Sequence, residues 1–185
     1  MILINKQPVS DLIGPKRILI NSFDSASNSL EFKTLLAGIA EVNRHANFAT
    51  ANNGLGREKK IAGVLDNCDI FISNLYLLNA VVSQKGCILS RAVAGIDIDG
   101  LGMTSLALDD WKRVAILTSP TQYPEFIKEI QAKGGTDLAL RFKLMKEAVE
   151  IIDKYARITR ECLKSYDFAR DIQPKLDIQS ADNVS

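Results

Sequence analysis

Few residues in this sequence have both a reactive side chain and the spacing that catalysis or metal binding requires. His45 is the single histidine, and a lone histidine near the start of a strand is more typical of a surface or packed residue than of a catalytic one. Asp97 and Asp99 flank one isoleucine, so in a strand their carboxylates would share a face and could bind a metal ion. A turn or a helix N-cap explains the pair better. We therefore predict no metal site and no organic cofactor.

Other stretches that could suggest a functional site also have ordinary structural explanations. Cys68, Cys87 and Cys162 lie far apart without a C-x-x-C pair, which is typical of reduced thiols rather than of a zinc site or a disulfide framework. Gly54-Leu55-Gly56 is a weak dinucleotide signal, because no acidic residue is placed to hold a ribose. Lys59-Lys60 is more typical of a solvated helix start than of a nucleic-acid patch.

Composition excludes several classes of partner. The chain has 185 residues, of which 46% are hydrophobic and 24% charged, and its net charge is +1. These values are ordinary for a globular domain and predict no strong attraction to nucleic acid or to an anionic membrane. The start of the chain does not resemble a signal peptide, and no apolar run approaches the length of a membrane helix. We expect a cytoplasmic protein.

The order of elements predicts an α/β fold with a doubly wound, mostly parallel sheet flanked by helices. A short apolar run typical of a buried strand occurs at residues 17–22, and further strands are predicted at residues 46–50, 69–75 and 113–118. Helical patterns occur at residues 29–42, around 60–65, and at 88–95, 102–111, 122–133 and about 136–163. Residues 1–16 are expected to form an N-terminal leader, 17–171 the domain, and 172–185 a polar tail.

In such sheets, ligands bind at the carboxyl ends of the strands. The corresponding loops are residues 22–29, 50–56, 73–77 and 118–122. A small anion could be held there by backbone N–H groups at a helix start.

Several stretches, in order, resemble the IMP cyclohydrolase family. Residues 72–76 (Ile-Ser-Asn-Leu-Tyr) are similar to its strand that ends in Asn-Leu-Tyr-Pro. Residues 94–100 (Ala-Gly-Ile-Asp-Ile-Asp-Gly) resemble its Ile-Asp-Ile-Gly-Gly turn, and residues 114–123 resemble its strand followed by Pro-x-x-Tyr. Residues 136–141 (Thr-Asp-Leu-Ala-Leu-Arg) resemble the start of its next helix. The resemblance covers residues 17–165 and implies the methylglyoxal-synthase-like fold, a homodimer and a purine-pathway nucleotide as ligand.

The resemblance also implies which residues hold the ligand. The family binds a phosphate with two loops, whose Asp-Lys-Thr-Gly and Ser-x-Gly-Gly-Thr motifs are replaced here by residues 24–27 and 50–54. Hydroxyls and amides remain, so the phosphate or the rest of the ligand is expected to contact six residues: Ser22, Ser25, Ser27, Thr50, Asn52 and Asn74.

The catalytic part departs further from the family. The family's Arg-Val-Lys-Thr-Leu-His-Pro segment has no counterpart between Leu55 and Asn67, and a later family lysine falls on Asp109. Tyr76 is left to donate a hydrogen bond and Asp97 to accept a proton while a nitrogen attacks a formyl carbon and water leaves. Compensating cations could come from Lys59, Lys60 or Lys112.

Two functions therefore stay open. One is a divergent IMP cyclohydrolase-like enzyme, a hydrolase of the cyclic-amidine class, acting on a formamido-imidazole ribonucleotide or a related phosphorylated compound. The other is a catalytically degenerate module that binds a nucleotide, regulates a partner or serves in dimerisation.

Overall fold

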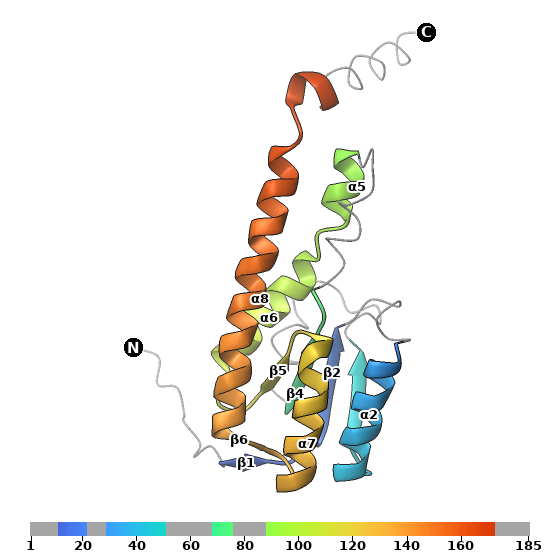
Figure 1. Cartoon of the computed structure of the whole chain (residues 1–185), viewed down its shortest axis with the longest axis vertical. Helices are drawn as coiled ribbons and strands as arrows, with labels where there is room; N and C mark the ends of the chain where they lie inside the picture. Colours follow the sequence, from blue (N-terminus) through green and yellow to red (C-terminus); the bar gives the residue numbers. More distant parts are fainter. Residues whose placement is uncertain (1–10, 22–28, 51–67, 76–87, 173–185) are drawn as a thin grey trace. The chain divides into compact units, whose positions relative to one another are not determined.

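The computed structural model describes residues 11–21, 29–50, 68–75 and 88–172 (Figure 1). They fall into two compact units, which we describe separately. The first comprises the described residues up to Leu75 together with Asp99–Ile151, and the second comprises residues 88–98 and 152–172. In this part of the chain, no helix combines the length and hydropathy that crossing a bilayer requires.

A parallel sheet with strand order β3-β2-β4-β5 forms the centre of the first unit. Its strands are β2 (Arg17–Asn21), β3 (Asn47–Thr50), β4 (Ile70–Ser73) and β5 (Ala115–Leu117). Each lies within a run that the sequence predicted to be a strand. Every residue of β4 and β5 is buried, which explains why these runs are continuously apolar instead of alternating.

Helices cover both faces of this sheet, as a doubly wound fold requires. On one face, α2 (Leu30–Val42) and α7 (Tyr123–Lys133) pack over the side chains of Ile18, Ile20, Ile70, Ile72 and Leu117. On the other face, α6 (Ile98–Asp109) packs through Met103 and Ala107 onto Leu19, Phe71 and Ile116. The predicted fold class is thereby confirmed.

The helix ends have local causes that the sequence contains. The Ser29 side chain accepts a hydrogen bond from the N–H of Phe32 and so caps α2. Gly134 ends α7 with φ of 77°, a left-handed conformation that glycine adopts without strain. Asp137 caps α8 (Leu138–Lys164) by accepting from the N–H of Leu140 at 2.8 Å.

A short antiparallel pair was not predicted. β1 (Leu12–Ile13) pairs with β6 (Thr136–Asp137), although residues 1–16 were expected to be a leader. Gly135 makes this pairing possible, because a Cβ at this position would lie 2.4 Å from the carbonyl oxygen of Ile13.

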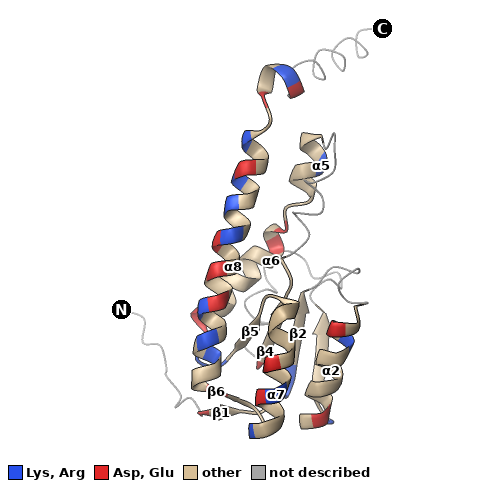
Figure 2. Cartoon of the chain, viewed as in Figure 1, with Lys and Arg blue, Asp and Glu red and all other residues tan. Residues whose placement is uncertain are grey.

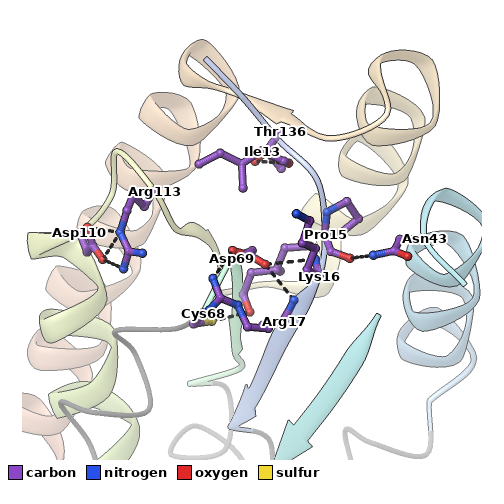
Figure 3. Close-up of polar contacts among 11 residues, drawn as sticks. Ile13, Pro15, Lys16, Arg17, Asn43, Cys68, Asp69, Asp110, Arg113 and Thr136 are labelled. Atoms are coloured by element: carbon purple, nitrogen blue, oxygen red, sulfur yellow. Dashed lines mark hydrogen bonds and ion pairs between the residues drawn. The ribbon is translucent and has the colours of Figure 1, made fainter. Parts of the chain in front are cut away.

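The amino ends of the central strands are tied by Asp69 (Figure 3). Its carboxylate accepts hydrogen bonds from the N–H groups of Lys16 and Arg17 at 3.1 and 2.9 Å, and it pairs with the Arg17 guanidinium at 3.1 Å. Charged groups at this edge therefore hold β2 and β4 together.

The second unit contains α5 (Leu89–Ala94), the C-terminal part of α8 and a π-helical turn at Phe168–Ile172. Tyr155 of α8 is buried, and its hydroxyl accepts a hydrogen bond from the N–H of Asp97 at 2.7 Å. This bond fixes the backbone at the turn between α5 and α6. The sequence predicted a turn or a helix start in this segment.

Candidate functional site

The ends of the four parallel strands lie along one edge of the sheet, which we call the carboxyl edge. The register pairs Asn21 with Ser73, and Ile72 with Leu117. Ser73 and Asn74 therefore end the central strand β4 between Asn21 on one side and Thr118 on the other. Thr50 ends the outer strand β3, where it pairs with Ile20 and is exposed.

Buried polar side chains are concentrated at the carboxyl edge. Asn21, Ser73, Asn74 and Thr118 are only 7, 0, 4 and 3% exposed, respectively. Burying such groups is unfavourable unless each finds a hydrogen-bonding partner. This edge of neutral polar groups differs from the amino edge, where the charged pair of Asp69 and Arg17 lies.

Three of these residues form what we call the polar row: Asn21, Ser73 and Thr118. Alternation along each strand places them on the same face as Leu19, Phe71 and Ile116, the face that α6 covers. The amide Nδ2 of Asn21 donates to the hydroxyl of Ser73 at 3.4 Å. The Thr118 hydroxyl is buried and has no hydrogen-bonding partner in the described part of the chain.

Asn74 lies on the opposite face, against α7. Its Oδ1 accepts a hydrogen bond from the hydroxyl of Tyr123 at 3.1 Å, and both side chains are buried. Burial raises the pKa of Tyr123 to about 12, so the phenol stays protonated and keeps donating. Because the amide oxygen is occupied by Tyr123, the NH₂ group of Asn74 is the part left to donate to a ligand.

Gln122 braces the loop that carries Thr118. Its Oε1 accepts from the N–H groups of Thr118 and Ser119 at 2.8 and 2.9 Å, and its Nε2 donates to Glu147 of α8 at 2.6 Å. Ser119 and Gln122 together form a capping box before α7. The loop is therefore held in one conformation before any ligand arrives.

The predicted site residues are placed as follows. Asn74 lies at the carboxyl edge as expected, and Thr50 lies at the exposed end of β3. Asp97 belongs to the second unit, where it is half-buried. The remaining predicted residues lie outside the described part of the chain: Ser22, Ser25, Ser27, Asn52 and Tyr76.

Three lysines were predicted to replace the missing family cations, and Lys112 is the one among them that the structure describes. Lys112 precedes β5, so it lies at the opposite end of that strand, where its ammonium sits 5.8 Å from the centre of the Trp111 ring. Lys59 and Lys60 lie outside the described residues. His45 is exposed just before β3, in agreement with its interpretation as a surface residue.

Sequence reasoning did not single out Asn21, Thr118 or Tyr123 as site residues. Polar residues directly after an apolar strand were the available signal, because the carboxyl ends of parallel strands meet at one edge. Their burial depends on neighbouring strands and helices and has no local signature.

The buried thiol of Cys68 and the buried phenol of Tyr123 predict that the folded protein loses stability in alkaline solution. Burial raises the pKa of Cys68 from 9.0 to about 12, and that of Tyr123 from 10.0 to about 12. Both groups hold their protons more tightly when folded, so their stabilising effect is complete below about pH 9 and is lost as the pH rises toward 12. We expect the Cys68 contribution to fall by about 2 kcal/mol at pH 10.5.

Urea unfolding at pH 8 and at pH 10.5 measures this effect. The Cys68→Ala variant should show a flatter decline in the free energy of unfolding than the wild type. Cys162→Ala, at a half-buried cysteine, is the matched control and should keep the wild-type slope. Equal slopes in all three proteins would contradict the prediction.

The sheet is doubly wound and parallel, with a polar carboxyl edge, and α/β domains of this architecture bind their ligands outside the strand ends. Comparison with known proteins places this domain more narrowly. Residues 107–184 match the family model of the AICARFT/IMPCHase bienzyme.

Curated relatives agree with the family match. The bifunctional purine biosynthesis protein PurH of Xylella fastidiosa (strain 9a5c) is 40% identical over 88 residues, which cover 47% of this chain and 17% of that protein. PurH of Neisseria gonorrhoeae (strain NCCP11945) is 34% identical over 92 residues, which cover 49% of this chain and 18% of that protein. The matched region thus spans less than a fifth of the length of these relatives.

Among solved structures, the crystal structure of ForH superposes with a TM-score of 0.55 at 15% sequence identity. The superposition covers 81% of this chain and 98% of that one, and it supports the fold. The resemblance predicted from the sequence is confirmed over about half of the chain, which is similar to PurH, a protein of purine biosynthesis, and matches the AICARFT/IMPCHase family model in residues 107–184.

Proposed function

We propose that this domain binds a formamido-imidazole ribonucleotide at the carboxyl edge and closes its second ring to give IMP. The observation that carries the proposal is the buried set of neutral polar side chains at that edge, with donors that the fold does not use. The relationship to purine-biosynthesis proteins supplies the class of ligand.

Ring closure makes modest demands on the protein. The carboxamide nitrogen attacks the formyl carbon, a C–N bond forms, and the former formyl oxygen leaves as water after two proton transfers. Negative charge develops on that oxygen during the attack, so a preorganised donor such as the NH₂ group of Asn74 would stabilise the transition state. Asp97 would accept the proton from nitrogen, and Tyr76 would donate toward the oxygen.

A second candidate is a nucleotide-binding module without turnover. It is supported by the sequence between Leu55 and Asn67, which has nothing similar to the family's segment with lysine and histidine. Under either proposal, the partners are a purine-pathway nucleotide and a second copy of the chain, and the protein is cytoplasmic. Gel filtration with light scattering tests the homodimer.

The two candidates are separated by turnover. Purified protein is mixed with the formylated imidazole carboxamide ribonucleotide, and IMP formation is followed by absorbance. Asp97→Asn is expected to lower the rate by about 10²–10⁴, whereas Asp99→Asn, at an exposed position two residues away, should keep it. No turnover together with thermal stabilisation by IMP would establish the binding module instead.

A further inference from the structure

We infer that the Thr118 hydroxyl is a ligand contact which, together with Ser73, donates to an uncharged oxygen of the bound nucleotide, a carbonyl or a hydroxyl. The inference rests on the proposed binding site at the carboxyl edge. It adds a specificity-determining pair of hydroxyls on the α6 face of the sheet, separate from Asn74 on the α7 face.

The first support is the unusual state of the Thr118 hydroxyl. Other buried threonine hydroxyls of the first unit have partners: Thr104 donates to the Gly100 carbonyl at 2.7 Å, and Thr136 donates to the Ile13 carbonyl at 3.4 Å. Among the described residues, Thr118 alone has a buried side-chain oxygen without a partner. Such a group destabilises the free protein, so its retention needs an explanation outside the fold.

The second support is its neighbour in the polar row. Ser73 is fully buried beside Thr118 and accepts from Asn21, but its own hydrogen has no acceptor in the described part of the chain. Two adjacent strands therefore present two O–H donors on one face. A single acceptor oxygen placed between them would satisfy both.

The third support is rigidity. Gln122 holds the N–H of Thr118, and the capping box fixes the residues that follow. Asn21 holds the Ser73 hydroxyl on the other side. Because the donors are held in place before binding, a ligand would lose little affinity through ordering them.

The type of acceptor follows from charge. The polar row consists of an amide and two hydroxyls, and the described strands of the sheet carry no charged residue toward their carboxyl ends (Figure 2). A phosphate buried there without a cation would be strongly disfavoured, whereas a carbonyl or hydroxyl oxygen would only exchange one hydrogen bond for another. We therefore assign the row to the base or the ribose of the nucleotide.

Thr118→Val tests the inference, because we expect it to raise the stability of the free protein and to lower its affinity for IMP. Valine keeps the shape and removes the unpartnered hydroxyl, so the thermal midpoint of the free protein should rise by roughly 2–8 °C. Affinity for IMP, measured by calorimetry, should fall about tenfold, while affinity for inorganic phosphate should not change. Thr104→Val, at an equally buried hydroxyl paired within its own helix, should leave both affinities unchanged.

Three results would overturn the inference. Unchanged IMP affinity in Thr118→Val would show that the hydroxyl does not contact the ligand. Equal weakening of IMP and inorganic phosphate would assign the row to the phosphate. A wild-type protein that binds neither probe would remove the site altogether. Thr118-dependent binding of IMP without turnover of the formylated ribonucleotide would refute only the proposed ring closure, and the inference would stand.

Discussion

Arg141→Met is expected to lower the free energy of unfolding by about 3–5 kcal/mol, which corresponds to a fall in the thermal midpoint of about 6–20 °C. Arg141 is fully buried although it is charged. Burial lowers its pKa from the usual value, but an arginine keeps its proton under ordinary conditions. Its charge must therefore be compensated inside the protein.

The compensation comes from backbone carbonyl oxygens of separate segments. The Arg141 guanidinium donates to the carbonyl of Lys112 before β5 at 2.8 Å, to the carbonyl of Thr136 in β6, and to the carbonyl of Asp11 beside β1 at 3.5 Å. Methionine has a similar length but no donor. The backbone carbonyls of Lys112 and Thr136 would lose their partner, and each such loss costs about 1–3 kcal/mol where the carbonyl is shielded from water.

Two further variants make this prediction specific. Arg141→Lys should also destabilise, because a lysine ammonium cannot span carbonyls that a planar guanidinium reaches together. Arg157→Met removes an exposed arginine from the same helix and should change stability by less than about 0.5 kcal/mol. Urea unfolding compares all three, and a loss below about 1 kcal/mol for Arg141→Met would show that the carbonyls find other partners.

Arg141 also shows what the sequence could and could not reveal. It belongs to the Thr-Asp-Leu-Ala-Leu-Arg stretch that contributed to the family resemblance, where it gave no hint of its role. The partners that span separate segments are backbone carbonyls, which every residue possesses, so no residue pattern marks them. Only the fold brings Lys112 and Thr136 to the same guanidinium.

The elements themselves were predictable because their signals are local. Three of the four strands of the sheet lie in short apolar runs, and Gly134 and Asp137 act at helix ends through local geometry. The β1–β6 pair was missed because two residues per strand are too few to show a period. α6 begins earlier than the predicted helix at 102–111, since its first residues were assigned to a turn.

The candidate site was predicted in part. Asn74 lies at a strand end, where its place in the sequence indicated, and its contact with a ligand stays a prediction. Its pairing with Tyr123, 49 positions later in the chain, depends on how α7 packs against the sheet. The contact of Asp97 with Tyr155 is likewise non-local. Sequence patterns locate strand ends well, whereas they do not show which polar side chains become buried there.

Asn74→Asp is expected to lower the rate of ring closure by about 10²–10³, the usual cost of losing one donor to a developing oxyanion. The substitution is nearly isosteric and keeps an oxygen that can accept from the Tyr123 hydroxyl, so the fold should survive. It replaces the NH₂ group by a carboxylate oxygen, which would repel negative charge in the transition state. Turnover and IMP affinity are measured side by side.

Tyr123→Phe tests whether catalysis needs the Asn74 amide to be held in one orientation, or only to be present. This variant keeps the Asn74 NH₂ group but removes the bond that selects which end of the amide faces the ligand. We expect a smaller loss in kcat, about tenfold, with little change in KM. If Tyr123 acts through Asn74, the double variant should be no slower than Asn74→Asp alone, because residues in one hydrogen-bonded network are not additive.

The comparison separates catalysis from packing. A purely structural Tyr123 would lower the thermal midpoint in proportion to any loss of activity, and its effect would add to that of Asn74→Asp. A positioning Tyr123 would lower kcat at temperatures where the variant is fully folded, and would do so only when Asn74 is present. Wild-type turnover in Asn74→Asp would exclude the amide as an oxyanion donor and would leave the proton transfers at Asp97 to account for the rate.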